Sequence, residues 1–567
     1  MDKPWTRMYE QGVPAEIAYP DGMVVTDFLE RAAERFPNNP ATIFPVAIGS
    51  RLLAGRLTYR DLDTAANRFA NALIQLGVQK GDRVALLFPN SPQFVIAYFG
   101  ALKAGAVVIA FNPVYTEHEI ERQLNDCGAE TVVTMTKWYL AIKQVQANTR
   151  VTRVIATNIK DYFHPIASAL FTVAKEEKEG FRVKIDPKDY SFKAMLAHAN
   201  DAKPNVKISP DDIALLQYTG GTTGVPKGAV LTHRNLVSNC LQCVAWFVSA
   251  QDGKEVTLSI IPFFHMYGMM VAMMFTIAKG GALVLFPKFD LQQAFMAIDT
   301  YRPTVFPGVP ALYIQFINSP DVSKHDLRSV KTCLSGAAPL PQEVQTGFEM
   351  LSGGRLVEGY GMTESSPLAH ANPIHGERRT GSIGVPVPST DARIVNPENA
   401  DEEMPAGAVG ELAIKGPQVF QGYWNRPEES VNTLRNGWLI TGDIARMDDD
   451  GFFYIVERKK DMIIIGGYKV FPRDIEEELF KHPKIQEATV IGVPHPKMGE
   501  VPKAFIVLKK GETATEQEIV EYMSKNVADY KVPRQIEFRD ALPKTIIGKV
   551  LKRQLMEEEK AKAKAKA

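Results

Sequence analysis

Helix and strand patterns alternate at short spacing near the start of this chain. Residues 58–80 carry apolar side chains at helical spacing, namely Leu62, Ala65, Ala66, Phe69, Ala70, Leu73 and Leu76. A strand pattern over 82–89, a helix over 91–105 that closes on glycine and a strand over 106–113 follow. This order predicts an α/β fold in which helices cover a sheet.

A second, smaller set of elements is predicted near the C-terminus. Helix patterns cover 472–483 and 516–527, and strand patterns cover 487–494 and 503–510. A chain of 567 residues is too long for one hydrophobic core. We therefore expect a large multi-layer N-terminal domain of mixed sheets and helices (1–459), a small α+β C-terminal domain (460–556) and a frayed low-complexity tail (557–567).

Composition argues against several classes of function. The formal net charge is zero, whereas proteins that bind nucleic acid usually carry a basic excess. Four cysteines in so long a chain do not form a disulfide framework, so we expect a reducing cytoplasm. Cys240 and Cys243 form a single C-x-x-C on a helical segment, which favours buried helix cysteines over a metal or redox site.

Two segments have apolar patterns that allow more than one interpretation. Residues 256–278 contain no Asp, Glu, Lys or Arg, but Pro262, His265 and Gly268 interrupt them, which favours a strand, a loop and a buried helix over a membrane span. Residues 159–200 combine an apolar stretch with mixed charges. They fit a surface insertion helix, with an interfacial membrane helix as the alternative.

A loop rich in glycine and threonine, YTGGTTGVPKG, occupies residues 218–228. Its glycines let backbone N–H groups approach and face an anion, the threonines add hydroxyl donors, and Lys227 adds a positive charge. The spacing matches neither G-x-x-x-x-G-K-[ST] nor G-x-G-x-x-G. The composition favours a phosphate-binding loop of another kind, with a flexible surface loop as the alternative.

Five further motifs follow the loop along the chain. They are PFFHMYG (262–268), LSGAAPL (334–340), EGYGMTES (358–365), NGWLITGDIARMDDDGFFYIVERKKDMI (436–463) and PKTIIGKVLKR (543–553). With the loop, they resemble the adenylate-forming superfamily of acyl- and aryl-CoA synthetases, non-ribosomal adenylation domains and firefly luciferase. The block from Asn436, with LQYTGGTTG and YKVP (530–533), is most similar to bacterial long-chain fatty acyl-CoA synthetases. The resemblance implies the adenylate-forming enzyme fold, with a mobile C-terminal domain.

The resemblance implies an ATP-dependent ligase that works in two steps. A fatty acid carboxylate attacks the α-phosphorus of ATP, and the thiol of coenzyme A then displaces AMP from the acyl-adenylate. Because the carboxylate is already ionised at pH 7, the first step needs orientation and charge neutralisation, to which Mg²⁺ contributes, and no general base. A homodimer and peripheral contact with a membrane stay open.

The resemblance also implies roles for individual residues. The nucleotide ligands are Thr219, Gly220, Gly221, Thr222, Thr223, Lys227, Gly336, Ala337, Tyr360, Gly361, Asp443 and Arg458. Lys549 bridges the α-phosphate and the carboxylate, Thr363 reaches the α-phosphate, and Glu364 ligates Mg²⁺. The acyl pocket contains His265, Met266, Tyr267 and Met269. The hinge is Lys460, and Gly467 lines the coenzyme A tunnel. Outside the motifs, such residues are more often exposed charges or satisfied core side chains.

The chain departs from the family pattern in three ways. Glu457 replaces the usual aspartate before the hinge, Asp474 replaces the usual glutamate of the following helix motif, and residues 268–270 lack the tryptophan that gates the acyl tunnel of some long-chain members. Chain length is therefore open. An acyl-AMP ligase, a medium-chain or aryl-CoA ligase and a catalytically silent nucleotide-binding protein are the alternatives.

Overall fold

The computed structural model describes residues 3–219, 226–459, 461–465, 468–495, 498–545 and 550–566. Contacts divide the chain into two compact units, Met1–Asp391 with Lys415–Leu439 and Ala392–Ile414 with Ile440–Ala567. The predicted α/β class is confirmed. The second unit takes in residues 392–414 and 440–459, which the sequence assigned to the large domain. A hinge at residue 460 remains a prediction.

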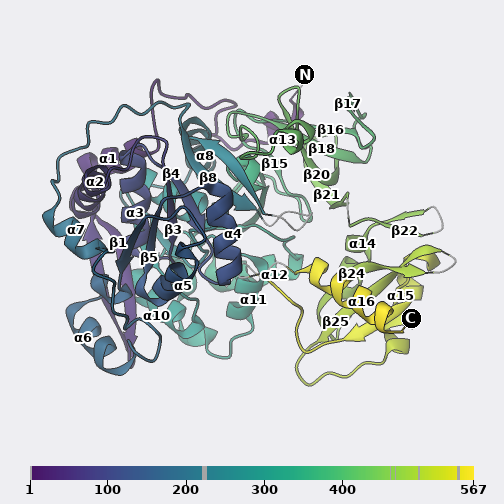
Figure 1. Ribbon diagram of the computed structural model, residues 1–567. Coiled ribbons are helices and arrows are strands. Elements are labelled where there is room, and N and C mark those ends of the chain that lie inside the picture. Colours follow the sequence, from purple (N-terminus) through teal and green to yellow (C-terminus); the bar gives the residue numbers. More distant parts are fainter. Residues whose placement is uncertain are drawn as a thin grey trace. The chain divides into compact units, whose positions relative to one another are not determined.

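A seven-stranded sheet organises the first unit (Figure 1). Its strands, in spatial order, are β7 (Tyr190–Ser191), β6 (Arg153–Thr157), β5 (Thr131–Met135), β3 (Arg83–Leu87), β4 (Val107–Phe111), β8 (Ile213–Thr219) and β9 (Lys227–Thr232). All neighbours are parallel except β8 and β9, which form an antiparallel pair. The parallel strands other than β7 are buried on both faces, which explains their continuous apolar runs.

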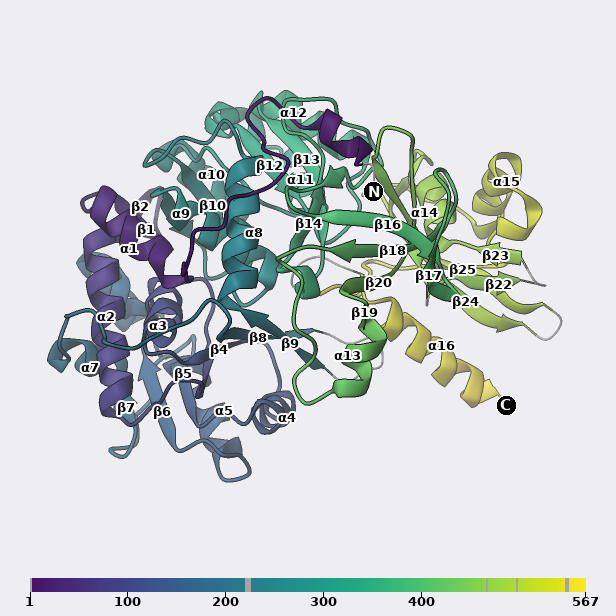
Figure 2. The same cartoon turned by 90° about the horizontal axis from the view of Figure 1, so that it is seen from above.

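Helices cover both faces of this sheet (Figure 2). On one side lie α2 (Tyr59–Gln75), α3 (Pro92–Lys103) and α7 (Phe192–His198); on the other lie α4 (Glu117–Cys127) and α5 (Thr136–Gln146). Thr58 and Asp61 form a capping box that begins α2. The helix ends at Gln75, before residue 80, because Gly77 at φ 83° turns the chain away.

Two four-stranded sheets also lie wholly within the first unit. One contains β10 (Val256–Ser259), β11 (Ala282–Leu285), β1 (Pro40–Ile48) and β2 (Arg51–Thr58), and the other β12 (Thr332–Ser335), β13 (Arg355–Gly361), β14 (Leu368–Ala371) and β15 (Val385–Pro386). Its remaining helices are α1 (Thr26–Arg35), α6 (Pro165–Ala174), α8 (His233–Trp246), α9 (Phe275–Ala278), α10 (Leu291–Tyr301), α11 (Pro310–Ile317), α12 (Gln342–Ser352) and α13 (Pro427–Thr433). Short 3-10 turns are Pro4–Met8, Ile159–Tyr162, Val322–Lys324, Leu327–Ser329 and Thr363–Ser365.

The uncharged stretch 256–278 is an internal part of this unit. It consists of β10, a loop, a buried π-helical segment (Gly268–Met274) and α9, so the prediction of strand, loop and buried helix is confirmed. Within the ranges that the structure describes, no helix is both long and apolar enough to span a bilayer.

The remaining strands form two further sheets. One contains β17 (Asn399–Glu403), β16 (Asp391–Asn396), β18 (Gly410–Lys415), β20 (Trp438–Met447) and β19 (Leu434–Arg435), with β21 (Phe453–Arg458) beside β20. The other contains β23 (Tyr468–Val470), β22 (Ile463–Ile465), β25 (Gly499–Leu508) and β24 (Ile485–His495), with β26 (Gln535–Phe538) beside β25. The helices of the second unit are α14 (Pro472–Phe480), α15 (Glu516–Asn526), α16 (Lys552–Lys566) and a 3-10 turn at Asp529–Lys531. The predicted C-terminal helices and strands are confirmed.

The predicted frayed tail is wrong at the level of secondary structure. Helix α16 continues through the tail to Lys566. Alanine, lysine and glutamate are strong helix formers, and the ion pairs Arg553–Glu557 at 2.7 Å and Glu559–Lys562 at 2.8 Å follow helical spacing. Leu555 is fully buried and anchors the helix on β24 and β25.

Candidate functional site

The glycine-rich loop connects two paired strands. Thr219 ends β8 and lies opposite Lys227, which begins β9. Four of the predicted ligands, Gly220, Gly221, Thr222 and Thr223, lie outside the described residues. The residues on either side of the loop are therefore paired directly with each other.

A later segment of the chain covers the edge of β9. The Val230 amide donates to the Gly422 carbonyl at 2.9 Å, and its carbonyl accepts from Gln421 at 3.0 Å. Tyr423 bridges to Ala229 in antiparallel register. Residues 421–424 therefore run beside the strand that begins at Lys227.

This segment brings Lys227 and Glu364 to one side chain. The Tyr423 hydroxyl donates to Glu364 Oε1 at 2.6 Å, and Lys227 Nζ lies 5.3 Å from the centre of the Tyr423 ring. Glu429 Oε1 is 3.8 Å from Lys227 Nζ. Burial and the Glu364 carboxylate raise the pKa of Tyr423 well above its usual value, so the hydroxyl keeps its proton. We call Lys227, Glu364, Tyr423 and Glu429 the lysine–glutamate cluster.

A second set of contacts braces the base of the loop. The Tyr218 hydroxyl donates to Asp126 Oδ2 at 2.5 Å, and Arg426 pairs with Asp126 Oδ1 at 2.6 Å. Tyr218, Asp126 and Arg426 line a cavity of about 250 Å³ with Pro226. The brace fixes the residues on either side of the loop relative to α4 and α13.

The motifs predicted to contact adenine lie at the carboxyl ends of parallel strands β12 and β13. Gly336 and Ala337 follow Ser335, the last residue of β12, which pairs with Glu358 of β13. Tyr360 lies two residues after Glu358, near the end of β13. Ligands of open parallel sheets commonly bind at this end. Ala337 has φ 67°, an unusual conformation for a residue with a side chain, and such strain often occurs at ligand sites.

Gly361 is required by close packing three residues before Glu364, the predicted magnesium ligand. A side chain there would place its Cβ 1.7 Å from the carbonyl oxygen of Pro367. Thr363 and Glu364 form the 3-10 turn that follows. Glu364 is buried, and its backbone carbonyl accepts from Phe420 at 2.9 Å.

The predicted acyl-pocket residues differ in their surroundings. His265 is half-buried, and its Nδ1 accepts from the Tyr267 amide at 3.3 Å. Met266 and Met269 are fully buried. The Tyr267 hydroxyl donates to the carbonyls of Leu334 at 2.5 Å and Gly308 at 3.1 Å, which joins this motif to the LSGAAPL strand. Burial also fits a core role, and the pocket stays a prediction.

The second unit brings two predicted ribose ligands together. Asp443 of β20 lies directly opposite Arg458 of β21. Asp443 is buried, and its amide donates to Thr441 Oγ1 at 3.2 Å. Lys460, Gly467 and Lys549 lie outside the described residues.

Sequence reasoning missed two residues, Asn90 and Tyr423, that hold parts of the predicted site in place. Asn90 donates to the Ser259 and Ile261 carbonyls at 3.0 Å each and accepts from the Phe263 amide at 2.7 Å, so it fixes the segment before His265. Tyr423 was missed as well. It lies in GYWNRPE, where glycine and proline indicated only a turn.

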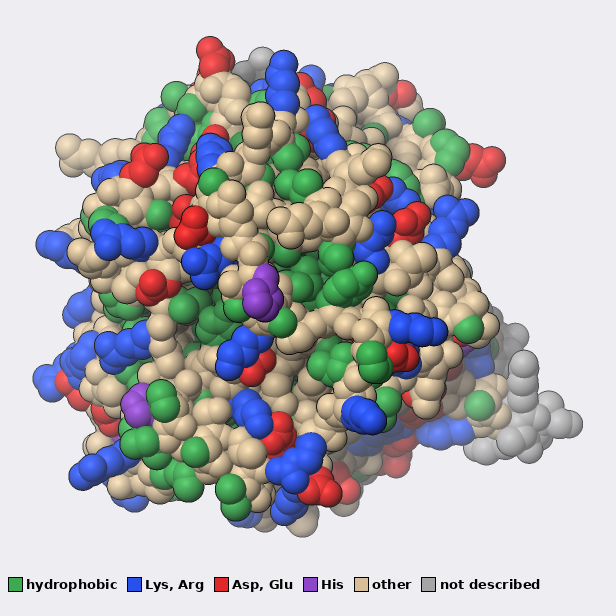
Figure 3. All heavy atoms as spheres, turned by 60° about the vertical axis from the view of Figure 1, so that its left-hand side comes forward, with side chains coloured by type: hydrophobic (Ala, Val, Ile, Leu, Met, Phe, Trp, Pro, Cys, Tyr) green, Lys and Arg blue, Asp and Glu red, His purple; other side chains and the backbone are tan. Residues whose placement is uncertain are grey.

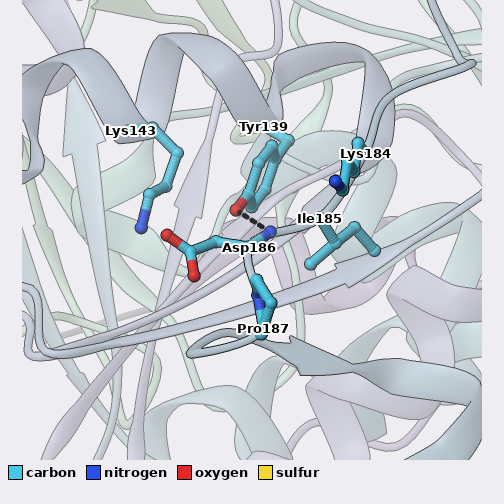
Figure 4. Close-up of a pocket in the computed structure, with 6 residues that line it drawn as sticks. All are labelled: Tyr139, Lys143, Lys184, Ile185, Asp186 and Pro187. Atoms are coloured by element: carbon cyan, nitrogen blue, oxygen red, sulfur yellow. Dashed lines mark hydrogen bonds between the residues drawn. The ribbon is translucent and has the colours of Figure 1, made fainter.

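A cavity of about 380 Å³ lies away from the predicted residues, none of which lines it (Figure 4). The Tyr139 hydroxyl accepts from the Asp186 amide at 2.9 Å and donates to Asp189 at 2.5 Å. Lys143 pairs with Asp189 at 2.9 Å. The polar groups of Tyr139 and Lys143 are thus engaged with the protein.

The two cysteines of the C-x-x-C motif lie on one buried helix. Cys240 and Cys243 are buried free thiols on α8, and burial raises the pKa of Cys243 to about 12. The interpretation of buried helix cysteines is confirmed. Across the described ranges, no group of three His, Cys, Asp or Glu side chains could hold a metal ion.

Known proteins resemble this chain along nearly its full length. A long-chain-fatty-acid–CoA ligase of Bacillus subtilis (strain 168) is 44% identical over 98% of both chains. A feruloyl-CoA synthase of Amycolatopsis sp is 35% identical over 91% of this chain and 97% of its own. The crystal structure of ATP-bound MatB from Rhodopseudomonas palustris has a TM-score of 0.82 and 30% identity, and covers 94% of this chain and 99% of its own.

Two family models also match the chain. The model of the AMP-binding enzyme C-terminal domain matches residues 474–549. The model of the AMP-binding enzyme matches residues 29–424, well over half of the chain, and this range contains the glycine loop with Lys227, Glu364 and Tyr423 of the lysine–glutamate cluster. The protein therefore belongs to the AMP-binding enzyme family.

Proposed function

We propose that this protein is an AMP-forming fatty acid–CoA ligase that acts on long-chain acids. The observation that carries the proposal is full-length similarity to long-chain-fatty-acid–CoA ligases, at 44% and 38% identity for those of Bacillus subtilis and Escherichia coli O6:H1. The lysine–glutamate cluster supports it, because a cation beside the loop and a buried carboxylate suit a metal-bound nucleotide.

The chain's own residues bind and orient the reactants. The ammonium of Lys227 offsets phosphate charge, and the loop directs its amides at the departing pyrophosphate. Asp443 accepts hydrogen bonds from the ribose hydroxyls. The acid needs no deprotonation at pH 7; its carboxylate oxygen forms a bond to the α-phosphorus as the bond to pyrophosphate breaks. The thiolate of coenzyme A then attacks the acyl carbon and AMP leaves.

The residues present fit a magnesium ion held together with the nucleotide. Glu364 offers one buried carboxylate, and the described part of the chain holds no three-residue metal cluster. Magnesium typically binds one or two carboxylates plus substrate phosphates. Glu364 would hold the ion, which would neutralise charge on the phosphates.

Lys549, Lys460 and Gly467 keep the roles that the family resemblance implies. Lys549 stabilises the charge that develops between the carboxylate and the α-phosphate. Lys460 serves as the hinge of domain alternation, and Gly467 leaves room for pantetheine because it has no side chain. Thr363 contacts the α-phosphate, and Tyr360 stacks on adenine beside Gly336 and Ala337.

The test of the function is an AMP-release assay across acids. Wild-type protein is supplied with ATP, Mg²⁺, coenzyme A and acids from acetate to oleate, with benzoate and coumarate. We expect the highest kcat/KM with long-chain acids. The 35% identity to a feruloyl-CoA synthase favours an aryl acid as the second candidate, and the same series decides between them. AMP release without thioester formation would indicate an acyl-AMP ligase, and no carboxylate-dependent pyrophosphate exchange would indicate a silent nucleotide-binding protein.

We also propose peripheral contact of α6 with the inner face of a membrane, in the cytoplasm. Ile166, Leu170 and Val173 follow helical spacing and are 58%, 49% and 88% exposed, while Phe171 is buried on the opposite side. Figure 3, which brings the α6 side of Figure 1 forward, shows hydrophobic side chains among basic and acidic ones. Free, buried cysteines support the reducing compartment.

Vesicle sedimentation tests this contact. Leu170→Ser with Val173→Ser should reduce binding to phosphatidylglycerol vesicles, whereas Val431→Ser, 70% exposed on α13, should not. Unchanged binding would contradict the role of α6. Light scattering before and after the double substitution reports whether the same face instead joins two copies of the chain.

A further inference from the structure

We propose that Tyr423 is a positioning residue of the nucleotide site, which fixes the carboxylate of Glu364 with its hydroxyl and the ammonium of Lys227 with its ring. This inference rests on the proposed function, since Glu364 and Lys227 matter here as ligands of a metal-bound nucleotide. It assigns Tyr423 no contact with the reacting atoms.

The backbone of Tyr423 is fixed by the strand that carries Lys227. Trp424 donates to the Gly228 carbonyl at 2.8 Å, and Tyr423 bridges to Ala229. On its other side, the Tyr423 amide donates to Ser430 Oγ at 2.8 Å. Contacts with β9 and with Ser430 of α13 therefore fix the Tyr423 backbone, and this fixes the point from which the side chain extends.

The hydroxyl holds a carboxylate that is already fixed at its backbone. Glu364 is 6% exposed, its carbonyl accepts from Phe420 at 2.9 Å, and its Oε1 accepts from Tyr423 at 2.6 Å. Phe420 and Tyr423 thus hold the backbone carbonyl and the side-chain carboxylate of Glu364 by hydrogen bonds. A ligating carboxylate works best when an outer hydrogen bond sets its orientation, and losing such a partner commonly costs 10- to 100-fold in metal affinity.

The ring of Tyr423 limits the positions that the Lys227 ammonium can take. The ammonium lies 5.3 Å from the ring centre and 3.8 Å from Glu429, and the Lys227 side chain is 19% exposed. A cation–π contact at such a site is weak, whereas charge-assisted bonds to phosphate are strong. Because the ring keeps the Lys227 ammonium beside Glu364 before and after the nucleotide arrives, the lysine loses less side-chain freedom when it also binds the phosphates.

Two substitutions separate the two parts of the side chain. Tyr423→Phe removes the hydroxyl and keeps the ring, and Tyr423→Leu removes both. Calorimetric titration of ATP, without acid or coenzyme A, is run with Mg²⁺ and with a chelator. We expect Tyr423→Phe to weaken ATP binding about 10-fold with Mg²⁺ and to leave it unchanged without. Tyr423→Leu should add a loss of about 2- to 5-fold in both conditions.

Tyr19→Phe is the matched control. The Tyr19 hydroxyl donates to the Met23 carbonyl at 2.6 Å, and Arg234 lies 5.0 Å from its ring centre. Tyr19→Phe therefore also removes a tyrosine hydroxyl that donates a hydrogen bond and leaves a ring with a cation nearby. Neither Met23 nor Arg234 belongs to the lysine–glutamate cluster. We expect the ATP affinity of Tyr19→Phe to match the wild type in both conditions.

The inference is overturned if Tyr423→Phe binds ATP with wild-type magnesium dependence, or more tightly with Mg²⁺, which would mean that the hydroxyl competes with the ion. If Tyr423→Phe does not fold, Ser430→Ala is used, because Ser430 Oγ accepts from the Tyr423 amide at 2.8 Å and so helps to fix the position of the Tyr423 side chain. A smaller loss in the same direction supports the inference, and none overturns it. Wild-type protein that binds ATP with magnesium dependence but releases no AMP with any acid would refute the proposed function alone.

Discussion

Asn90 offers a sharp test of how the segment before His265 is held in place. Its amide is 2% exposed and makes three hydrogen bonds to that segment. Among the described residues, the Ile261 carbonyl and the Phe263 amide have Asn90 as their hydrogen-bond partner, whereas the Ser259 carbonyl also accepts from Phe286 at 3.3 Å. Replacing Asn90 therefore leaves two buried backbone groups unpaired.

The size of the loss depends on whether water can replace the amide. Each unpaired buried group costs about 1–3 kcal/mol, so Asn90→Leu, which fills the space, should cost about 2–6 kcal/mol. Asn90→Ala leaves room for a water molecule, which recovers part of the loss and lowers the cost to about 1–3 kcal/mol. The more hydrophobic residue is therefore expected to be the more destabilising one.

Urea unfolding followed by tryptophan fluorescence measures both variants. Asn71→Ala is the control, because Asn71 also donates to two carbonyls, those of Asn200 and Ala202 at 2.8 Å, but at an exposed site; water should hold its cost below about 1 kcal/mol. A leucine variant as stable as the alanine variant, or more so, would refute the reasoning. Both Asn90 variants should raise KM for the acid more than KM for ATP.

Four further predictions concern the site and its pH dependence. Lys549→Ala should largely abolish adenylation and spare thioester formation from supplied acyl-adenylate; equal loss in the two half-reaction assays would contradict its role. Gly467→Leu should do the reverse, and a normal overall rate would argue against the tunnel. Gly361→Ala should abolish ATP binding measured by calorimetry, because its Cβ would lie 1.7 Å from the Pro367 carbonyl; wild-type affinity would show that the turn tolerates a side chain. Burial lowers the pKa of His233 to about 4, below its unfolded value of about 6.5. Its contribution to stability is thus complete above pH 6.5 and is lost as the pH falls toward 4, with a slope of at most about 1.4 kcal/mol per pH unit; His233→Asn should flatten that part of the urea-midpoint profile, and an unchanged slope would assign the acid sensitivity to other groups.

The sequence predicted those helices and strands whose apolar pattern matches the side chains that are buried in the fold. Helices α2 and α3 begin at caps that could be read directly, and the apolar runs of β3 and β4 are those of strands buried on both faces. Helix α16 was missed because low complexity resembles disorder, although its alanines, lysines and glutamates favour a helix.

The motifs located Lys227 and Glu364 but not the side chain that joins them. Tyr423 is separated from both by long stretches of sequence, and its position follows from the pairing of residues 421–424 with β9. Asn90 was missed for the same reason. Polar residues that hold other residues through tertiary contacts carry no local pattern, so only the fold reveals them.

The pairing of residues 421–424 with β9 also bears on how the chain is made. Strand β9 would otherwise end its sheet with an unpaired edge, and such edges are templates for pairing with other chains. At roughly 5–20 residues per second, the stretch of roughly 190 residues between Thr232 and Gln421 takes about 10–40 s to synthesise. During that interval the nascent chain exposes the edge, and its solubility then depends on chaperones or on the speed of translation.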